Sequence, residues 1–226
     1  MILELRDINK SYAEGDGNPD RVIIKNLNLK IDFNESISIV GSSGCGKTTL
    51  LNLIGTLDNP NSGEILINGN DVTKMSDDEL SLIRAKYIGF IFQSHHLLPQ
   101  ISVIENVKIP CIANNDINKA SINDKAEELL IKVGLKDQFN KLPSQLSGGE
   151  KQRVAIIRSL INEPNLILAD EPTGSLDKSR GDEIIDLLQD LCINDKTSLV
   201  VVTHDHGIAS RMQRKFTFQN LNFIES

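Results

Sequence analysis

A run of nine residues in the first quarter of the chain has the glycine, lysine and threonine spacing of a phosphate-binding loop. Its glycines let the backbone bend so that successive N–H groups form a concave site for an anion. Lys47 can reach terminal phosphates as a point charge, and the Thr48 hydroxyl can ligate Mg²⁺. Thr49 supports the helix start, and Cys45 is interpreted as a small filler. The loop comprises Gly41, Ser42, Ser43, Gly44, Cys45, Gly46, Lys47, Thr48 and Thr49.

The segments on either side of this loop have the periodicity that a phosphate loop needs. The apolar run 37–40 before it predicts a buried strand. The spacing of Leu50, Leu53, Ile54 and Leu57 after it predicts the core stripe of a helix. A glycine-rich loop that binds nothing is the alternative, and the strand–turn–helix setting disfavours it.

Three further apolar runs end in polar residues. The runs are 88–92, 166–169 and 199–202, and the residues that follow them include Gln93, Asp170, Glu171 and His204. In an open parallel sheet, ligands gather beyond the carboxyl ends of the strands. We therefore expect these four side chains to converge on the phosphate loop.

Each of these side chains has a chemistry suited to phosphoryl transfer. Asp170 would hold Mg²⁺ through a water molecule, and Glu171 would orient and polarise the attacking water. The Gln93 amide can bond both a metal shell and a water, because it is donor and acceptor. His204 can donate to the transferring γ-phosphate. The alternatives are a solvated acidic pair, a polar strand end and a structural histidine.

Two more features have open interpretations from spacing alone. Ser147, Gly148 and Gly149 precede Glu150 in a capping-box pattern, so they are either an ordinary helix start or part of a phosphate site on another molecule. Tyr12 follows the first predicted strand. Its ring either stacks on a base or covers the sheet edge.

The composition narrows the class of protein. The chain has 226 residues and a net charge of −7, which disfavours broad nucleic-acid binding. Its three cysteines lack metal-site spacing and indicate a reducing compartment. No apolar run approaches the roughly 20 residues of a membrane span, and the N-terminus alternates like a strand. We expect a cytoplasmic protein that works at a membrane only through a partner.

The order of predicted strands and helices indicates an α/β fold, to which an antiparallel strand pair and a helical lobe are added. The segments 2–8 and 22–31 alternate like antiparallel strands, with a loop over 11–20 between them. The stretch from about 93 to 141 has more helix character and predicts a separate helical lobe, including a helix over 121–134. Residues 216–224 predict a closing edge strand or hairpin.

The segment from Leu146 to Arg153 resembles the signature motif of ATP-binding-cassette (ABC) ATPases. The ordered set of motifs is similar as well: a Walker A loop at 41–49, a Q-loop glutamine at 93, Walker B at 166–171, a D-loop at 175–177 and a switch histidine at 204. The resemblance implies a P-loop NTPase fold with a mainly parallel core sheet, an antiparallel β-subdomain and a helical subdomain. It implies a single domain over 1–226, with the core at 1–92 and 160–226 and the helical subdomain at about 93–159.

The same resemblance implies cofactors and partners. Two chains would sandwich two ATPs with Mg²⁺ as an ATP-dependent homodimer. Ser147 and Gly149 of one chain would face the γ-phosphate held by Lys47 of the other, with Asp177 in the D-loop, and Tyr12 falls at the adenine-stacking position. Integral membrane permease subunits would dock in a groove near 93–110. The protein would then be peripheral, on the cytoplasmic face of the inner membrane.

Within that family, the segment from His95 to Pro99 is most similar to the lipoprotein-releasing branch, with macrolide-export and cell-division ATPases as close relatives. Ser159 stands where alanine is usual, and the tail after Arg214 lacks the usual Asp-Gly turn. A soluble cassette ATPase acting on DNA or ribosomes is a competing function, which the acidic composition disfavours. An ATP-gated assembly module in which hydrolysis matters little is another.

Overall fold

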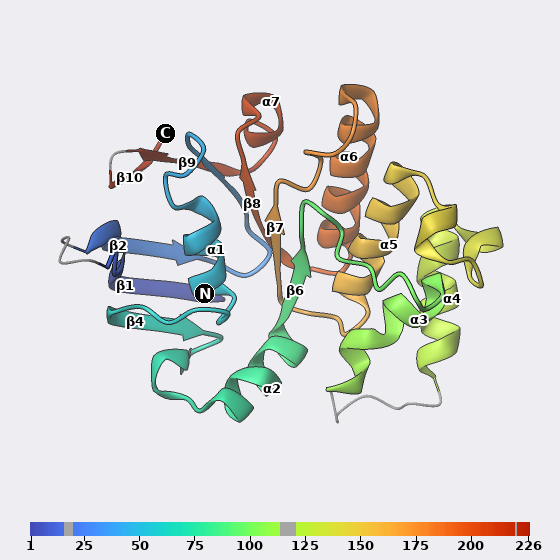
Figure 1. The fold of residues 1–226 in the computed structure, drawn as a ribbon, viewed down its shortest axis with the longest axis horizontal. Coiled ribbons are helices and arrows are strands. Elements are labelled where there is room, and N and C mark those ends of the chain that lie inside the picture. The colour runs from blue at the N-terminus through green and yellow to red at the C-terminus, as the bar shows by residue number, and fades with distance from the viewer. Residues whose placement is uncertain (16–19, 114–120, 220) are drawn as a thin grey trace.

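The core of the protein is a sheet whose central strands run parallel. The computed structural model describes residues 1–15, 20–113, 121–219 and 221–226. Within these ranges the sheet has six strands in the order β10, β9, β3, β8, β7, β6 (Figure 1). All neighbours pair in parallel except β9 and β10, which form the hairpin expected at the C-terminus. The strands are β3 (Ser36–Val40), β6 (Ile88–Ile91), β7 (Leu166–Asp170), β8 (Ser198–Thr203), β9 (Arg214–Gln219) and β10 (Asn222–Glu225).

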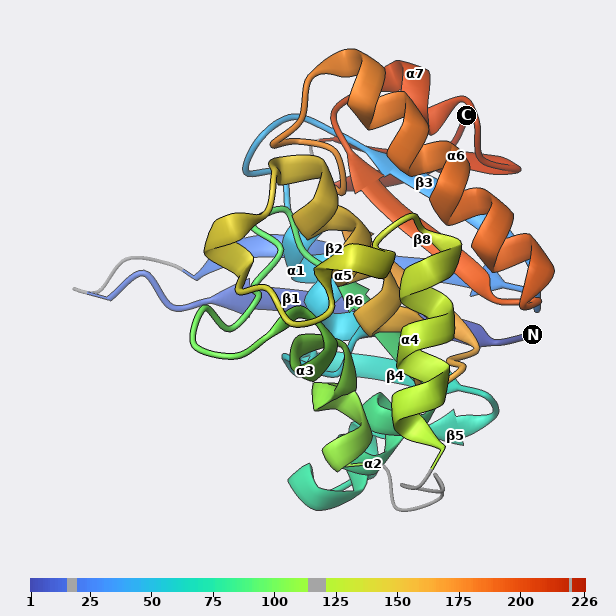
Figure 2. The same cartoon turned by 90° about the vertical axis from the view of Figure 1, so that its right-hand side faces the viewer.

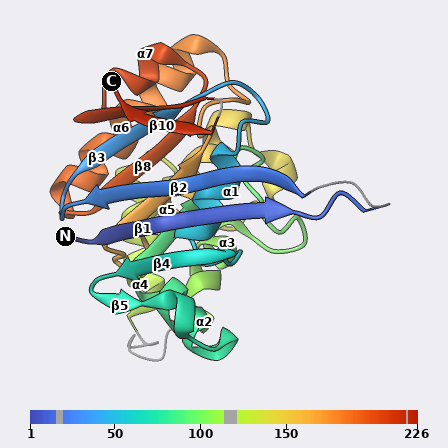
Figure 3. The same ribbon diagram turned by 90° about the vertical axis from the view of Figure 1, so that its left-hand side faces the viewer.

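A second, antiparallel sheet lies beside the core (Figure 3). Its order is β2, β1, β4, β5, with β1 (Leu3–Tyr12), β2 (Arg21–Ile31), β4 (Ser62–Ile67) and β5 (Asn70–Asp71). The helix α1 (Lys47–Ile54) shares one hydrophobic core with residues of both sheets. Burial of its apolar stripe in that core fixes the start of α1, and so fixes the loop that leads into it.

The first strand is longer than the sequence predicted. β1 continues to Tyr12, whose backbone pairs with Arg21 of β2. Tyr12 is therefore the last residue of a strand and not part of a loop. Cross-strand pairing with β2 extends the strand beyond the apolar alternation that ends at Ile8. Residues 16–19 of the loop predicted over 11–20 lie outside the described residues.

Helices cover the other face of the core sheet. α5 (Gly148–Leu160), α6 (Lys178–Asn194) and α7 (His206–Ala209) pack against it. The strand β7 shows the alternation this requires, because Ile167 and Ala169 join that helical core, whereas Leu166 and Leu168 join the core shared with α1. α2 (Asp77–Tyr87) precedes β6 and begins at a capping box formed by Ser76 and Glu79.

A third hydrophobic cluster lies among the helices of the region between β6 and β7 (Figure 2). The region contains α3 (Val103–Lys108), a 3₁₀ turn η2 (Ile109–Ile112) and α4 (Ile122–Lys132). α5 belongs to both parts: Val154 and Ile157 pack in this cluster, and Ile156 packs against the core sheet. No helix in the described ranges is long and apolar enough to cross a bilayer.

One predicted core residue is in fact on the surface. α1 ends at Ile54, with Gly55 as its C-cap, so Leu57 no longer follows the helical period. Leu50, Leu53 and Ile54 are fully buried, as the stripe predicts, whereas Leu57 is 50% exposed. A short helix thus turns the last residue of the predicted stripe outward.

Candidate functional site

The phosphate loop joins β3 to α1 in a conformation that needs glycine. Gly46 has a φ of 110°, and a Cβ there would lie 2.7 Å from Ile23 Cγ2. A Cβ on Gly41 would lie 2.4 Å from the carbonyl oxygen of Phe218 on β9. Lys47 is 8% exposed, and its Nζ donates to the carbonyls of Gly41 (2.8 Å) and Ser42 (3.0 Å). The ammonium is therefore held over the loop at the N-terminus of α1, where the helix dipole also favours an anion.

Asp170 lies directly beside the loop. Thr48 Oγ1 donates to Asp170 Oδ2 at 2.9 Å, although the two residues are 122 positions apart. Burial raises the pKa of Asp170, and the bond from Thr48 opposes that shift. A cavity of about 510 Å³ is lined by both residues together with Lys47, Gln93 and Glu171. Hydroxyl, carboxylate and amide oxygens are the ligands that Mg²⁺ prefers, so the donor set fits that ion.

Glu171 leaves the end of β7 in the left-handed region, with a φ of 46°. Its N–H donates to Val202 O at 2.8 Å, which continues the pairing with β8. Its side chain is 14% exposed, and Oε1 lies 2.8 Å from Nδ1 of His204, whose side chain is 71% exposed. Thr203 Oγ1 donates to Oε2 at 3.0 Å. The predicted base and the predicted switch histidine are therefore in direct contact.

Tyr12 forms part of the wall of a neighbouring cavity of about 460 Å³, together with Gly44, Gly46 and Lys47. Its hydroxyl donates to Asp58 Oδ2 at 2.6 Å, and this bond is the main cause of a raised Tyr12 pKa. The ring is 43% exposed. The exposed ring is thus held at the edge of the phosphate loop, in a position where a flat group could stack on it.

The second glycine-bearing helix start is a complete capping box. Ser147 Oγ accepts from the N–H of Glu150, and the Glu150 carboxylate accepts from the N–H of Ser147 at 2.8 Å. Ser147 and Gly149 line a cavity of about 310 Å³. Among the described residues, its lining includes no member of the phosphate loop 41–49. Asp177 caps α6 and lines a fourth cavity, of about 240 Å³, with Glu171 and His204. Within one chain, the structure therefore separates the signature residues from the phosphate loop.

The structure brings in residues that sequence analysis did not single out. Thr203 contacts the Glu171 carboxylate, and Asp58 holds Tyr12. Arg158 of α5 donates to the carbonyls of His95 and His96, both at 2.6 Å. Adjacent polar residues at a strand end were the only available signal for Thr203. Nothing in the local sequence indicates the other two contacts, since their partners are distant along the chain.

The comparisons with known proteins agree with this geometry. The sequence matches the family described as ABC transporter over residues 24–174. The chain belongs to the ABC transporter ATPase family. This ABC ATPase is 44% identical over 220 residues to the lipoprotein-releasing system ATP-binding protein LolD of Shewanella frigidimarina, an overlap that covers 97% of this chain and 90% of that protein. LolD of Colwellia psychrerythraea is 44% identical over 214 residues, which cover 95% and 82% of the two chains.

Two solved structures share the fold of this ABC ATPase. A dimeric structure of the ATP-binding cassette MJ0796, in a post-hydrolysis state bound to ADP and Pi, has a TM-score of 0.89 and 38% identity over 99% of this chain and 98% of that one. Another dimeric structure of MJ0796, a bacterial ABC transporter cassette, has the same TM-score and 39% identity. The family and fold class predicted from the motifs are confirmed, and the protein is a nucleotide-binding transporter ATPase.

Replacing Tyr12 with alanine is expected to weaken ATP binding. Stacking of a base on an aromatic ring contributes about 1–3 kcal/mol, so the KM for ATP of Tyr12→Ala should rise about tenfold, with little change in kcat. Tyr12→Phe keeps the ring and loses the hydroxyl that bonds to Asp58, so it should bind ATP nearly normally. Steady-state ATPase assays measure both values. Equal losses in both variants would mean that the hydroxyl, and not the ring, is what matters.

Proposed function

We propose that this ABC ATPase powers the release of lipoproteins from the inner membrane, bound to the cytoplasmic face of that membrane through integral permease subunits. The supporting observation is the likeness to LolD proteins, which spans almost the whole chain. The relatives reported above carry the lipoprotein-releasing name, which favours this branch over macrolide export and cell division. The net charge of −7 disfavours a nucleic-acid substrate.

The site supports a division of roles among residues of the 510 Å³ cavity. Lys47 and the N–H groups of residues 41–49 would bind the phosphates of ATP. Thr48 would ligate Mg²⁺, Asp170 would hold it through a water molecule, and the Gln93 amide would bond to its ligand shell. The bound ion would neutralise charge on the β- and γ-phosphates. The 2.9 Å bond between Thr48 and Asp170 supports this set, because it places two oxygen ligands side by side.

Glu171 and His204 would carry the hydrolytic step. Glu171 would accept a proton as water attacks the γ-phosphorus, and the bond from that phosphorus to the β–γ bridging oxygen breaks, giving ADP and phosphate. His204 would donate a hydrogen bond to the γ-phosphate. Its side chain is 71% exposed, so it has room to turn from Glu171 toward a bound phosphate.

The separation of Ser147 and Gly149 from the loop supports a site completed by a second copy. In the proposed ATP-dependent homodimer, these residues of one chain face the γ-phosphate held by Lys47 of the other, with Asp177 beside them. The solved structures of MJ0796 are dimeric as well, which supports a homodimer. We further propose one domain over 1–226, with a core at 1–92 and 160–226 and a helical subdomain at about 93–159.

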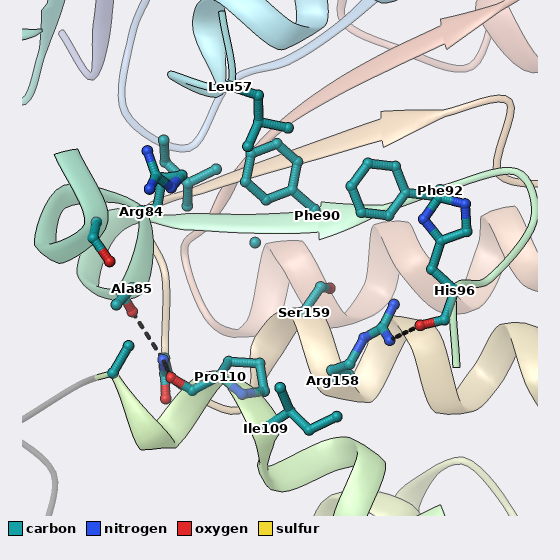
Figure 4. A pocket seen from close by; sticks show the side chains of 15 residues that line it. Leu57, Arg84, Ala85, Phe90, Phe92, His96, Ile109, Pro110, Arg158 and Ser159 are labelled. Carbon is teal, nitrogen blue, oxygen red and sulfur yellow. Dashed lines mark hydrogen bonds between the residues drawn. The ribbon is translucent and has the colours of Figure 1, made fainter. Parts of the chain in front are cut away.

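A groove between the core and the helical region would receive the permease. It has a volume of about 410 Å³ and lies between α2, β6, η2 and α5 (Figure 4). Phe90, Phe92 and His96 form a row of stacked rings along it, with centroids 5.6 and 4.8 Å apart. Asn162 ties its two sides together by donating to Ala85 O (2.8 Å) and Pro110 O (3.0 Å). An apolar floor with fixed walls suits a short helix of a membrane subunit.

Co-purification from native membranes tests the function. The tagged chain should recover integral membrane subunits, whereas the purified chain alone should be a weak and mostly monomeric ATPase. Mass spectrometry of the recovered subunits identifies the branch. Recovery of no membrane subunit would count against a transporter, and salt-sensitive recovery of nucleic acid would favour the soluble alternative.

A substitution on the groove should separate docking from catalysis. Leu57 lines the groove and is 50% exposed, so Leu57→Asp places a charge where an apolar contact is proposed. Burial of a leucine contributes about 1.5–3 kcal/mol, and we expect recovery of the membrane subunits to fall about tenfold or more, with the intrinsic ATPase unchanged. Ile193→Asp on α6 is the matched control, because Ile193 is 73% exposed and does not line the groove. Equal recovery with both variants would place the permease elsewhere.

A further inference from the structure

Two neighbouring residues at the end of β8 hold the Glu171 carboxylate, and they differ sharply in burial. Thr203 donates to Oε2, and His204 contacts Oε1. Thr203 is 1% exposed, whereas the His204 side chain is 71% exposed. A buried β-branched side chain is stiff at χ1, whereas an exposed side chain changes rotamer freely. Thr203 is therefore the fixed partner of the carboxylate, and His204 is the partner that can leave.

The Thr203 hydroxyl has a defined direction. Its oxygen accepts a hydrogen bond from the N–H of Asp205 at 3.0 Å. A hydroxyl carries one proton, and here that proton is donated to Glu171 Oε2. The other carboxylate oxygen, Oε1, lies on the side of His204, which lines the same cavity as Lys47. When His204 turns away, Oε1 becomes available to a water and Oε2 stays bonded.

The same strand also fixes the backbone of Glu171. Its φ of 46° lies in a region that non-glycine residues rarely adopt, so surrounding contacts must hold it. The N–H of Glu171 donates to Val202 O (2.8 Å), and its carbonyl accepts from the N–H of Gly174 (3.0 Å). Val202 and Thr203 are consecutive, so the end of β8 determines both where Glu171 sits and where its carboxylate points.

We propose that Thr203 is a positioning residue for ATP hydrolysis, which holds Oε2 of Glu171 so that Oε1 is the oxygen that receives the proton of the attacking water. This inference rests on the proposed role of Glu171 as base. Thr203 is not among the residues that line the 510 Å³ cavity, so it would act only through Glu171. Its loss should therefore lower kcat and leave nucleotide binding intact.

The test uses the purified full-length chain with Thr203→Val, which keeps the shape and loses the hydroxyl, and Thr203→Ser, which keeps the hydroxyl. A hydrogen bond to a charged group contributes more than one between neutral groups. We therefore expect kcat of Thr203→Val to fall about tenfold or more, with the KM for ATP unchanged. The ATP-bound dimer should accumulate, because hydrolysis is slowed and binding is not. Thr203→Ser should keep close to the normal kcat. Thr203→Ala, measured in parallel, gives the same test if the valine variant does not fold.

Thr197→Val is the matched control, because Thr197 is also buried, lies directly before β8, and donates its hydroxyl to Pro164 O (3.0 Å), away from Glu171. It should keep normal kcat. The proposal is overturned if Thr203→Val and Thr203→Ala both hydrolyse ATP normally, if Thr203→Ser is as slow as they are, or if they fail to bind ATP. Failure of the base assignment looks different: Glu171→Gln would then hydrolyse ATP normally whatever stands at position 203.

Discussion

Lys47→Ala should abolish nucleotide binding. The Lys47 ammonium already donates to two carbonyls of its own loop, and these bonds aim it into the cavity shared with Thr48 and Asp170. It supplies a positive charge next to a carboxylate pair, so its loss leaves the site repelling a triphosphate. Hydrogen bonds between charged groups contribute about 1.5–3 kcal/mol each, so losing two bonds from the ammonium to phosphate oxygens would weaken binding about a hundredfold or more. Titration with a fluorescent ATP analogue measures this directly.

Lys132→Ala is the control for that experiment. Lys132 lies on α4 and pairs with Glu128, so its loss removes the same charge at a surface remote from the loop. It should bind the analogue normally. Because the loop carbonyls lose their partner in Lys47→Ala, thermal unfolding should be followed as well. A folded Lys47→Ala variant that binds ATP as tightly as the control would show that the loop N–H groups suffice.

The site residues that the sequence predicted all lie in short stretches of the chain whose pattern can be read without knowing the fold. The phosphate loop needs closely spaced glycines followed by Lys47 and Thr48, and the turn between β3 and α1 shows that pattern directly. The positions of Asp170 and His204 could be predicted because Asp170 directly follows the apolar run 166–169 and His204 comes two residues after the run 199–202. Parallel pairing then brings the ends of β3, β7 and β8 side by side.

The parts that sequence missed depend on register and on distant contacts. Thr203 meets Glu171 because β7 and β8 pair with Asp170 opposite Val202, and no local pattern gives that register. His95 and His96 both have a left-handed backbone, and the guanidinium of Arg158 binds both of their carbonyls. His95 is partly buried, and that burial lowers its pKa.

The sequence also placed the ends of two elements, β1 and α1, wrongly. Tyr12 belongs to β1 because β2 supplies its partner, and Leu57 is exposed because α1 ends three residues earlier. The end of β1 is set by pairing with another strand, whereas α1 ends at its own C-cap, Gly55, which leaves Leu57 outside the helix. These two errors matter for function, since one residue borders the phosphate loop and the other borders the groove.

Glu171→Gln should bind ATP and accumulate as a closed dimer. The amide is close in shape to the carboxylate, so it can still accept from Thr203, yet it cannot take a proton from water. General-base catalysis contributes about 10²–10⁴ in rate, and we expect kcat to fall about a thousandfold with ATP affinity retained. Phosphate release measures the first effect, and size-exclusion chromatography with light scattering in the presence of ATP measures the second.

Glu163→Gln is a close control for this change. Glu163 also has a left-handed backbone, with a φ of 52°, and it pairs with Lys125 on the surface. The control therefore makes the same charge change at a residue with a similar backbone, outside the site. It should hydrolyse ATP normally and show no ATP-stabilised dimer beyond that of the unmodified chain. If Glu171→Gln behaved like this control, then Glu171 would not be the base, and the attacking water would have to lose its proton to another group of the cavity.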